Sequence, residues 1–196
     1  MEKLSKLLFK YRSYTPIPFV IIMLLFQRVS GISLATGFLI ALAGELIRLW
    51  AVSHAGSETR TTGKVGGSFL VISGPYSYIR NPLYFGNILI YFGIGIISMS
   101  LFPYLQIIAI LFFLFQYYYI ILEEERYLAA TFDNYNLYFK EVPRIFPRLT
   151  PFKNPGIVQP EYDIKKGLKS EKRTLQAFFI IILILILFWI FEIKLV

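Results

Sequence analysis

The sequence predicts an all-α fold, a polytopic helical membrane protein with about five transmembrane helices. Apolar residues make up 56% of the 196 positions and charged residues only 16%, whereas soluble domains carry about 25% charged residues. The mean hydropathy is +0.60. The length fits a single domain that covers residues 1–196. Composition therefore indicates a chain that is solvated mainly by lipid.

Each predicted span is an apolar run, and a run of about 20 residues suffices to cross a bilayer as a helix. The expected spans are residues 17–26, 32–52, 83–100, 104–122 and 174–191. The first run is short and must recruit flanking residues to cross. Pro103 separates the third run from the fourth, because proline interrupts a helix, and it leaves a tight hairpin.

Lysine and arginine residues predict the orientation of these spans. With a cytoplasmic N-terminus, the inner segments 1–13, 53–82 and 123–173 carry 4, 3 and 10 of them. The outer segments then carry only Arg28 and Lys194. Because cytoplasmic loops are enriched in Lys and Arg, we expect a multi-pass protein whose N-terminus is cytoplasmic. The membrane would be the plasma membrane in a prokaryote and the endoplasmic reticulum in a eukaryote.

Composition also limits the possible chemistry. The chain has no cysteine and one histidine, His54, which excludes a thiolate nucleophile and a metal centre built from Cys or clustered His. The net charge is +8, and in a membrane protein such a charge indicates contact with anionic lipid headgroups rather than with nucleic acid. We therefore expect membrane lipids as partners, and neither nucleic acid nor a metal.

The segment before the third span has the features of a helix start. Gly74-Pro75 is a turn signal, and Asn81-Pro82 matches an N-cap residue followed by proline at the first helical position. The N-terminus of a helix presents free backbone N–H groups that suit an anionic ligand. The alternative is a well-capped transmembrane helix with interfacial Arg and Tyr side chains.

Three carboxylates, Glu123, Glu124 and Glu125, follow the fourth span. A helix that ended at Leu122 would place them at its negative end, which is unfavourable. Either the helix continues to about Phe132, or a cation offsets the charge, and a ligand with an ammonium and a sulfonium is such a cation. The alternative is a solvated acidic cluster paired with nearby cations.

Arg144 lies between Pro143 and Pro147, which hold the chain extended. A fixed guanidinium near the headgroups suits the carboxylate or phosphate of a ligand, and equally the phosphate of a lipid. Residues 150–172, with a basic stretch at 165–169, are expected to form a surface segment that leads to the last span.

Two features lie inside the predicted spans. Glu45 and Arg48 are three residues apart on one helix face and can pair, either as functional groups or as a structural ion pair. Gly86, Gly93 and Gly95 form a stripe of small residues that favours close packing between helices.

Taken in order, these motifs resemble the isoprenylcysteine carboxyl methyltransferase and phospholipid methyltransferase superfamily. The resemblance covers about residues 70–150. The matching residues are Gly74-Pro75-Tyr76, Arg80-Asn81-Pro82, Tyr84, Gly86, Glu124-Glu125, Leu128, Phe132, Tyr135, Tyr138, Pro143-Arg144 and Pro147. The sequence departs from the pattern at Asn81, where many members have histidine, and at Asp133, where a glycine is usual. The helix at about 174–191 is an addition that the smallest members lack.

The resemblance implies an integral membrane methyltransferase that uses S-adenosylmethionine at the cytosolic face. The implied acceptor is lipophilic, a prenylcysteine-like carboxylate or a phospholipid amine, and enters a tunnel within the membrane. By similarity, the cofactor site comprises Tyr76, Arg80, Asn81, Pro82, Tyr84, Glu124 and Glu125. The catalytic candidates are Arg144, as a counter-charge for a carboxylate, and Glu124 or Glu125, as a base for an amine.

Two other interpretations remain open. Membrane reductases of sterol or enone type, which depend on NADPH, are similar to the C-terminal region of this superfamily. The other interpretation is a small membrane scaffold without catalysis, which predicts that no cofactor binds. Binding of S-adenosylhomocysteine or of NADPH to the purified protein distinguishes the three.

Overall fold

The computed structural model describes residues 2–56 and 69–195. Over these residues the chain is helical and contains no strand, which confirms the all-α prediction. The elements in chain order are α1 (Glu2–Tyr11), α2 (Pro16–Leu25), α3 (Gly31–Ala55), the 3-10 helix η2 (Gly74–Ser77), α4 (Pro82–Ser98), α5 (Tyr104–Thr131), α6 (Tyr135–Glu141) and α7 (Ile164–Ile190).

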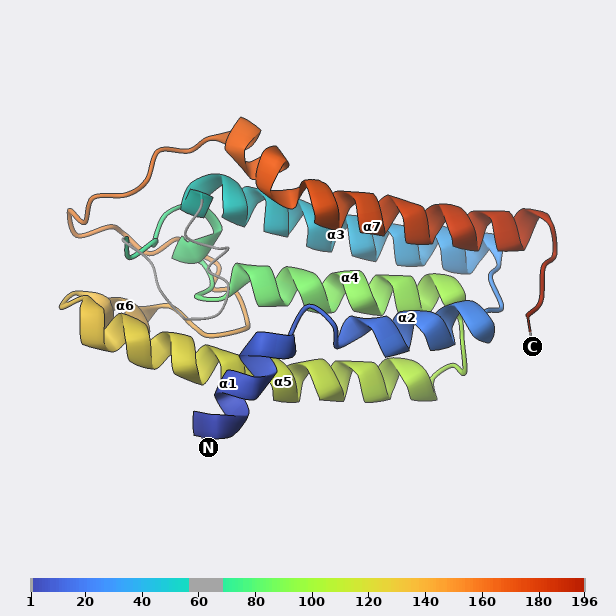
Figure 1. The fold of residues 1–196 in the computed structure, drawn as a ribbon. Helices are drawn as coiled ribbons and strands as arrows, with labels where there is room; N and C mark the ends of the chain where they lie inside the picture. Colours follow the sequence, from blue (N-terminus) through green and yellow to red (C-terminus); the bar gives the residue numbers. More distant parts are fainter. Residues whose placement is uncertain (1, 57–68, 196) are drawn as a thin grey trace.

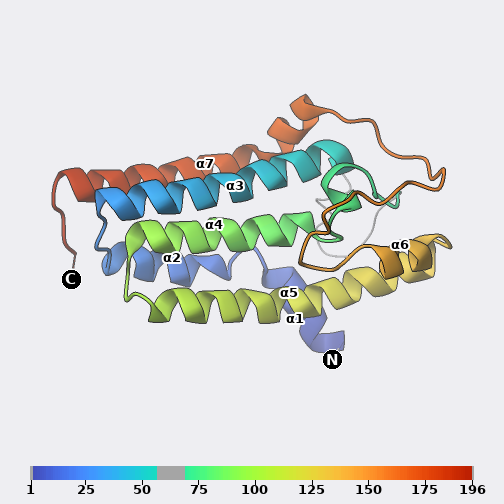
Figure 2. The ribbon, with the colours of Figure 1, turned by 180° about the vertical axis from the view of Figure 1, so that it is seen from behind.

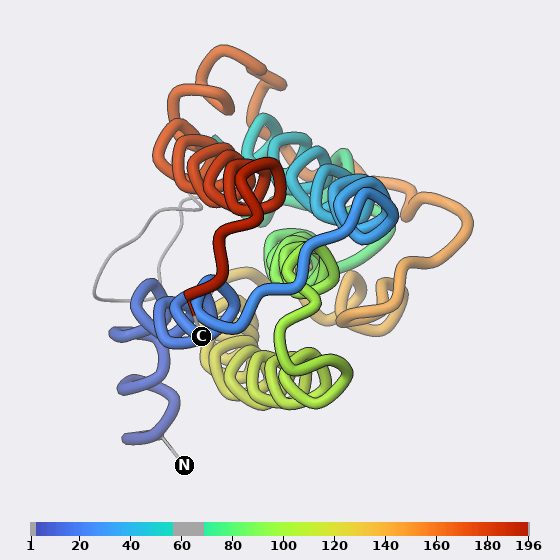
Figure 3. Tube along the Cα trace, turned by 90° about the vertical axis from the view of Figure 1, so that its right-hand side faces the viewer, coloured from blue at the N-terminus to red at the C-terminus, as the bar shows by residue number. Residues whose placement is uncertain are grey.

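Helix α4 lies at the centre of a bundle (Figures 1 and 3). It contacts α2, α3, α5 and α7, which run along it, and α1 packs across α5. Viewed along the bundle, α3 and α7 lie on one side of α4, and α2 and α5 lie on the other (Figure 3). Since α4 begins at Pro82, this arrangement places its N-terminus at the middle of one end of the bundle.

Three helices of the described chain are long and apolar enough to cross a membrane: α3, α5 and α7. The first and third predicted spans correspond to the shorter apolar helices α2 and α4, which have 10 and 17 residues. The hairpin predicted at Pro103 is present, because α4 ends at Ser98 and α5 begins at Tyr104.

The last helix starts earlier than expected. Residues 164–172 were predicted to lie in a surface segment; they form the first turns of α7, and Lys165, Lys166 and Lys169 are exposed there. The Asp163 carboxylate caps the helix by accepting a hydrogen bond from the backbone N–H of Lys166 at 3.0 Å. Gly167 is buried against Ser53 of α3, so these turns are held by packing as well as by the cap.

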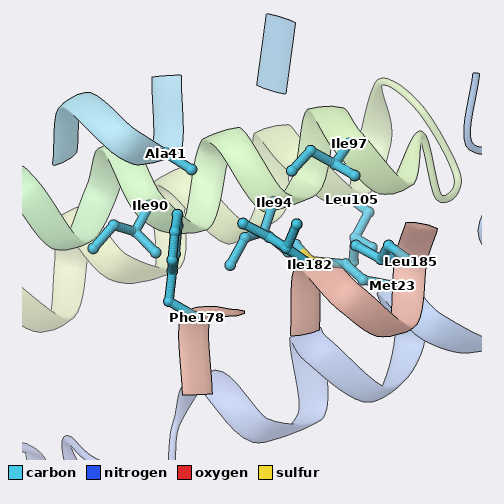
Figure 4. Packing of buried hydrophobic residues seen from close by; sticks show 9 residues of the cluster. All are labelled: Met23, Ala41, Ile90, Ile94, Ile97, Leu105, Phe178, Ile182 and Leu185. Carbon is cyan, nitrogen blue, oxygen red and sulfur yellow. The ribbon is translucent and has the colours of Figure 1, made fainter. Parts of the chain in front are cut away.

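The main apolar core lies between α4 and its neighbours (Figure 4). Ile90, Ile94 and Ile97 of α4 meet Phe178, Ile182 and Leu185 of α7, together with Met23, Ala41 and Leu105. These side chains are at most 6% exposed. The core therefore fastens the last helix to the central one along its apolar length.

Glycines bring α3 and α4 close together, as the predicted stripe indicated. A Cβ atom added to Gly86 would lie 2.7 Å from the carbonyl oxygen of Gly44, and one added to Gly93 would lie 2.6 Å from the backbone nitrogen of Ala41. Gly95 differs, because its added Cβ would face the side chains of Gln106 and Met23 instead. Two of the three glycines thus serve the α3–α4 contact.

Replacing Gly93 with alanine is expected to lower the melting temperature of the detergent-solubilised protein, because overpacking against a backbone costs about 1–3 kcal/mol. Gly95→Ala is the matched control: its Cβ would lie 3.2 Å from Gln106 Cγ and 3.3 Å from Met23 Cε, side-chain atoms that can shift. Both changes gain the same helix propensity. Equal melting temperatures for the two variants would contradict the packing role of Gly93.

The polar segments gather at one end of the bundle. Residues 69–81, helix α6 and residues 142–163 all lie beyond the N-terminus of α4, whereas the α4–α5 turn and the C-terminus lie at the other end (Figures 1 and 2). The segment before α4 and the segment after the apolar part of α5 therefore emerge together, as the predicted hairpin requires.

Candidate functional site

Arg80 joins the segment before α4 to the segment after α5. Its guanidinium donates to Glu125 at 2.9 Å and to the carbonyl oxygens of Phe139 and Val142 at 2.5 and 2.7 Å. Its backbone N–H donates to the carbonyl of Pro143 at 2.9 Å. The Arg80 side chain is only 8% exposed, so these bonds replace those it would make with water.

Glu125 is also bound by Arg144. The Arg144 Nε and Nη2 atoms lie 3.1 and 2.5 Å from the two carboxylate oxygens of Glu125, which is a bidentate pair. The hydrogen bond to Glu125 raises the pKa of Arg144 above its ordinary value. The segment between the prolines was predicted to be extended, but it bends at residues 144–146, and it presents Arg144 to an internal carboxylate. Glu125 serves two guanidinium groups at once.

Glu124 has a different environment. Its carboxylate accepts a hydrogen bond from the Tyr84 hydroxyl at 2.6 Å, and the Tyr84 ring packs on Tyr117 with centroids 4.6 Å apart. Nearby, burial and the charge of Glu124 raise the pKa of Tyr76, so this phenol stays protonated at neutral pH. The hydrogen bond between Tyr84 and Glu124 couples the first turn of α4 to the last third of α5.

The three consecutive glutamates lie within α5, because the helix continues to Thr131. The sequence allowed either a longer helix or a cation that offsets the three charges, and the structure shows the longer helix. Glu123 pairs with the exposed Arg126 at 3.3 Å, while Glu124 and Glu125 face inward to the partners described above. Successive residues of a helix are rotated by about 100°, which separates their surroundings.

Asn81 is at the N-cap position of α4, but its side chain does not cap the helix. The Asn81 amide instead donates to the carbonyl oxygen of Arg144 at 3.0 Å. The predicted N-cap position of Asn81 and the proline at the first helical position are therefore confirmed, while the Asn81 side chain binds the segment after α6 instead of the helix. The first-turn N–H groups of α4 donate no hydrogen bond to the Asn81 side chain and point toward the same end of the bundle.

A cavity of about 850 Å³ lies beside these contacts. Its lining includes all seven residues predicted for a cofactor site: Tyr76, Arg80, Asn81, Pro82, Tyr84, Glu124 and Glu125. Arg144 is not among the lining residues, since its guanidinium is bound to Glu125. The cavity continues along α4 past Ile90 and Ile94, between Val20 of α2 and Phe178 of α7.

The cavity wall also contains Arg48, Asn87 and Glu171, which were not predicted as site residues. Arg48 was expected to pair with Glu45, and the two form an ion pair with Arg48 Nε 3.9 Å from a Glu45 carboxylate oxygen. Arg48 also donates shorter hydrogen bonds to Glu171 of α7 at 2.7 Å and to Asn87 of α4 at 2.6 Å. No local signal identifies Glu171, because its partner lies on a helix that is distant in sequence.

The chain is similar to one protein family and to two curated proteins. Residues 32–135 match the family described as phospholipid methyltransferase. That segment contains nearly all of α3, the whole of α4 and α5, and all seven of the residues above, whereas α1, α2 and α7 lie outside it. No solved structure matches the chain significantly.

Two curated relatives carry names that refer to metal resistance. The cobalt-zinc-cadmium resistance protein CzcN of Cupriavidus metallidurans is 34% identical over 125 residues, which cover 64% of this chain and 54% of that protein. The nickel-cobalt-cadmium resistance protein NccN of Alcaligenes xylosoxydans xylosoxydans is 30% identical over 126 residues, 64% of this chain and 55% of that protein. The match thus spans about half the length of each relative.

The family match extends over more than half of the chain and contains the cavity residues of α4 and α5. It agrees with the ordered motifs that the sequence presents between Gly74 and Tyr135. The chain therefore belongs to the phospholipid methyltransferase family.

Proposed function

We propose that the protein transfers a methyl group from S-adenosylmethionine to a lipophilic acceptor at the cytosolic face of a membrane. The observation that carries this proposal is the position of Glu124. This carboxylate lines the cavity and is hydrogen-bonded to a neutral phenol, Tyr84, whereas the neighbouring Glu125 is already held by two guanidinium groups. Glu124 is thus the carboxylate suited to the ammonium group of the cofactor.

The cavity suits such a cofactor in size and in chemistry. About 850 Å³ lies within the range of about 300–1,000 Å³ for small-molecule sites. The first turn of α4 lines the cavity at Pro82, Leu83 and Tyr84, and a helix N-terminus favours an anionic group such as the cofactor carboxylate. The cavity wall therefore offers one group for each charge of an amino acid moiety.

The apolar part of the cavity suits the acceptor. Ile17 and Ile21 of α2 line it although they are about half exposed on the outer surface, and Ala177 of α7 is a further exposed lining residue. The cavity thus reaches the apolar exterior of the bundle between α2 and α7. A lipophilic acceptor would enter from the bilayer by this route.

When bound, the cofactor supplies an electrophilic methyl group for in-line displacement by the acceptor. The residues of the chain position the two partners and exclude water, which lowers the barrier by several kcal/mol. A carboxylate acceptor needs no base. For an amine acceptor the candidate base is Glu124, because Glu125 is engaged by Arg80 and Arg144. Arg144 contributes by holding Glu125 rather than by direct contact with the cavity.

The proposed orientation places the end of the bundle that carries α6 in the cytosol. The distribution of Lys and Arg, with 10 of them in residues 123–173, supports this side. The N-terminus would then also be cytoplasmic.

Titration of the detergent-purified protein with S-adenosylhomocysteine tests the cofactor assignment. We expect calorimetry to give a saturable binding heat with S-adenosylhomocysteine and none with NADPH. Binding of NADPH alone would favour a membrane reductase, and binding of neither would favour a scaffold.

The acceptor class can be read from labelled product. Membranes that contain the protein are incubated with methyl-labelled S-adenosylmethionine, and the lipid fraction is treated with base. Label that is released by base indicates a methyl ester and hence a carboxylate acceptor. Label that resists base indicates an amine or thiol acceptor, and absence of any label in the lipid fraction would contradict a lipophilic acceptor.

A further inference from the structure

Arg48 is a charged residue in the wall of the cavity, within the helix α3 that is long enough to cross a membrane. Its side chain is 11% exposed. An ionisable group within a membrane span is costly and is usually kept for a function. The proposed cofactor contacts do not use this guanidinium, so its role needs a separate account.

The fold fixes the Arg48 guanidinium from two sides. Nη1 donates to the Asn87 side-chain oxygen of α4 at 2.6 Å, and Nη2 donates to Glu171 of α7 at 2.7 Å. Its aliphatic chain crosses α4 at Gly86, where an added Cβ would lie 2.6 Å from Arg48 Cγ. The position of the Arg48 guanidinium is therefore determined by the space above Gly86 and by its hydrogen bonds to Asn87 and Glu171.

Arg80, in the segment before α4, also lines the cavity, but its guanidinium is bound elsewhere. Arg80 uses Nη1 for two backbone carbonyls and Nη2 for Glu125, and its guanidinium lies 4.2 Å from the centre of the Phe139 ring. A guanidinium has five N–H donors, so Nη1 and Nη2 of Arg48 each keep a second N–H beyond the bonds to Asn87 and Glu171.

The position of Arg48 along the cavity is also informative. Its partner Asn87 lies one turn of α4 beyond Tyr84, and the next lining residues of α4 are Ile90, Tyr91 and Ile94. Arg48 therefore lies where the polar part of the cavity meets the apolar part. The polar end of an amphiphile whose tail occupies the apolar part would reach this level.

We propose that Arg48 binds an anionic oxygen group of the acceptor, a carboxylate or a phosphate, and that Glu171 is the positioning residue that holds the Arg48 guanidinium. This inference rests on the proposed function. The ion pair with Glu171 compensates the buried charge of Arg48, because an unpaired buried guanidinium is strongly unfavourable. Glu171 comes from a helix outside the family match, so this part of the acceptor site is supplied by α7.

Binding of simple amphiphiles to the purified full-length protein in a nonionic detergent tests the proposal. The probes are decyl phosphate, decanoate and the neutral decanol, each titrated without cofactor. We expect the wild-type protein to bind at least one anionic probe about tenfold more tightly than decanol, since a hydrogen bond to a charged group is worth about that factor. Preference for decyl phosphate indicates a phosphate source, and preference for decanoate indicates a carboxylate.

The variants separate binding from structural support. Arg48→Gln should abolish the preference for the anionic probe, and Glu171→Gln should reduce it severalfold. If Glu171 acts through Arg48, then adding Glu171→Gln to the Arg48→Gln variant should change the affinity for the anionic probe by less than about twofold. Arg48→Lys replaces Arg48→Gln if the latter does not fold. Lysine keeps the charge but lacks the planar set of N–H donors, so the preference for the anionic probe should weaken. Lys172→Gln, an exposed change beside Glu171, is the control and should leave the preference intact.

Equal affinity of the wild-type protein for decanol and both anions would overturn the proposal, as would an undiminished preference in the Arg48 variants. If Glu171→Gln lowered the melting temperature but left the preference for the anionic probe unchanged, Glu171 would have a structural role only. That result would overturn its positioning role. The assay needs no cofactor, so its result is independent of S-adenosylhomocysteine binding. Failure of that binding with retained anion preference would reject the methyltransferase proposal alone.

Discussion

Replacing Glu125 with glutamine is expected to cause the largest loss of stability of any single change at the site. Glu125 is 8% exposed and neutralises both Arg80 and Arg144. Removal of one partner from a buried ion pair costs about 3–5 kcal/mol, because the remaining charge is left uncompensated. The segment after α6 is fastened by these bonds, so the variant should melt at a lower temperature and should be cleaved faster by protease between residues 142 and 163.

Glu123→Gln is the matched control for this prediction. Glu123 is on the same helix and pairs with Arg126, whose side chain is 54% exposed. Surface ion pairs contribute only about 0–1 kcal/mol, so the control should melt close to the wild-type protein. If the Glu125 and Glu123 variants were equally stable, the ion pairs of Glu125 would not hold the two segments together.

Replacing Glu124 with glutamine is expected to weaken S-adenosylhomocysteine binding by about 10- to 100-fold with little change in melting temperature. A hydrogen bond to a charged group contributes about 1.5–3 kcal/mol, and glutamine removes the charge but retains the shape. The affinity is measured by calorimetry in detergent. The hydrogen bond from Tyr84 can persist to the glutamine oxygen, so the fold should be preserved.

Glu123→Gln again provides the control, since its side chain faces Arg126 rather than the cavity. Tyr84→Phe is a second test: it removes the hydroxyl that orients Glu124 and should weaken binding less than Glu124→Gln does. Unchanged affinity of the Glu124 variant would reject Glu124 as the residue that holds the cofactor ammonium.

Helix α7 extends the family core in a way that bears on acceptor choice. The matched segment ends at residue 135, whereas Glu171, Ala177 and Phe178 of α7 line the cavity. Val20 and Ile21 of α2 line the opposite wall and also precede the matched segment. The α2 and α7 walls of the proposed acceptor route therefore lie outside the matched segment, while the proposed cofactor end is built from it.

The family resemblance implied the set of residues around Arg80 and the glutamate pair, which line one cavity. Local patterns in the sequence determined the helical class, the turn at Pro103 and the close-packing glycines at 86 and 93. These features depend on hydrophobic run length, on proline and on short spacings, which act within a few residues. The bond from the Asn81 side chain to Arg144 and the start of α7 at Ile164 were not predicted, because each depends on a contact with a distant segment.

Only the tertiary structure decided which groups face each other. Consecutive glutamates of one helix point in different directions, and packing of α5 against α4 selects Glu124 for the cavity and Glu125 for the arginines. Arg48 forms its hydrogen-bonded ion pair with Glu171, 123 residues away, and a longer ion pair of 3.9 Å with Glu45 on its own helix. The physical reason is that a side chain bonds to whatever the folded bundle brings within about 3 Å, and that proximity is set by helix rotation and packing rather than by sequence spacing.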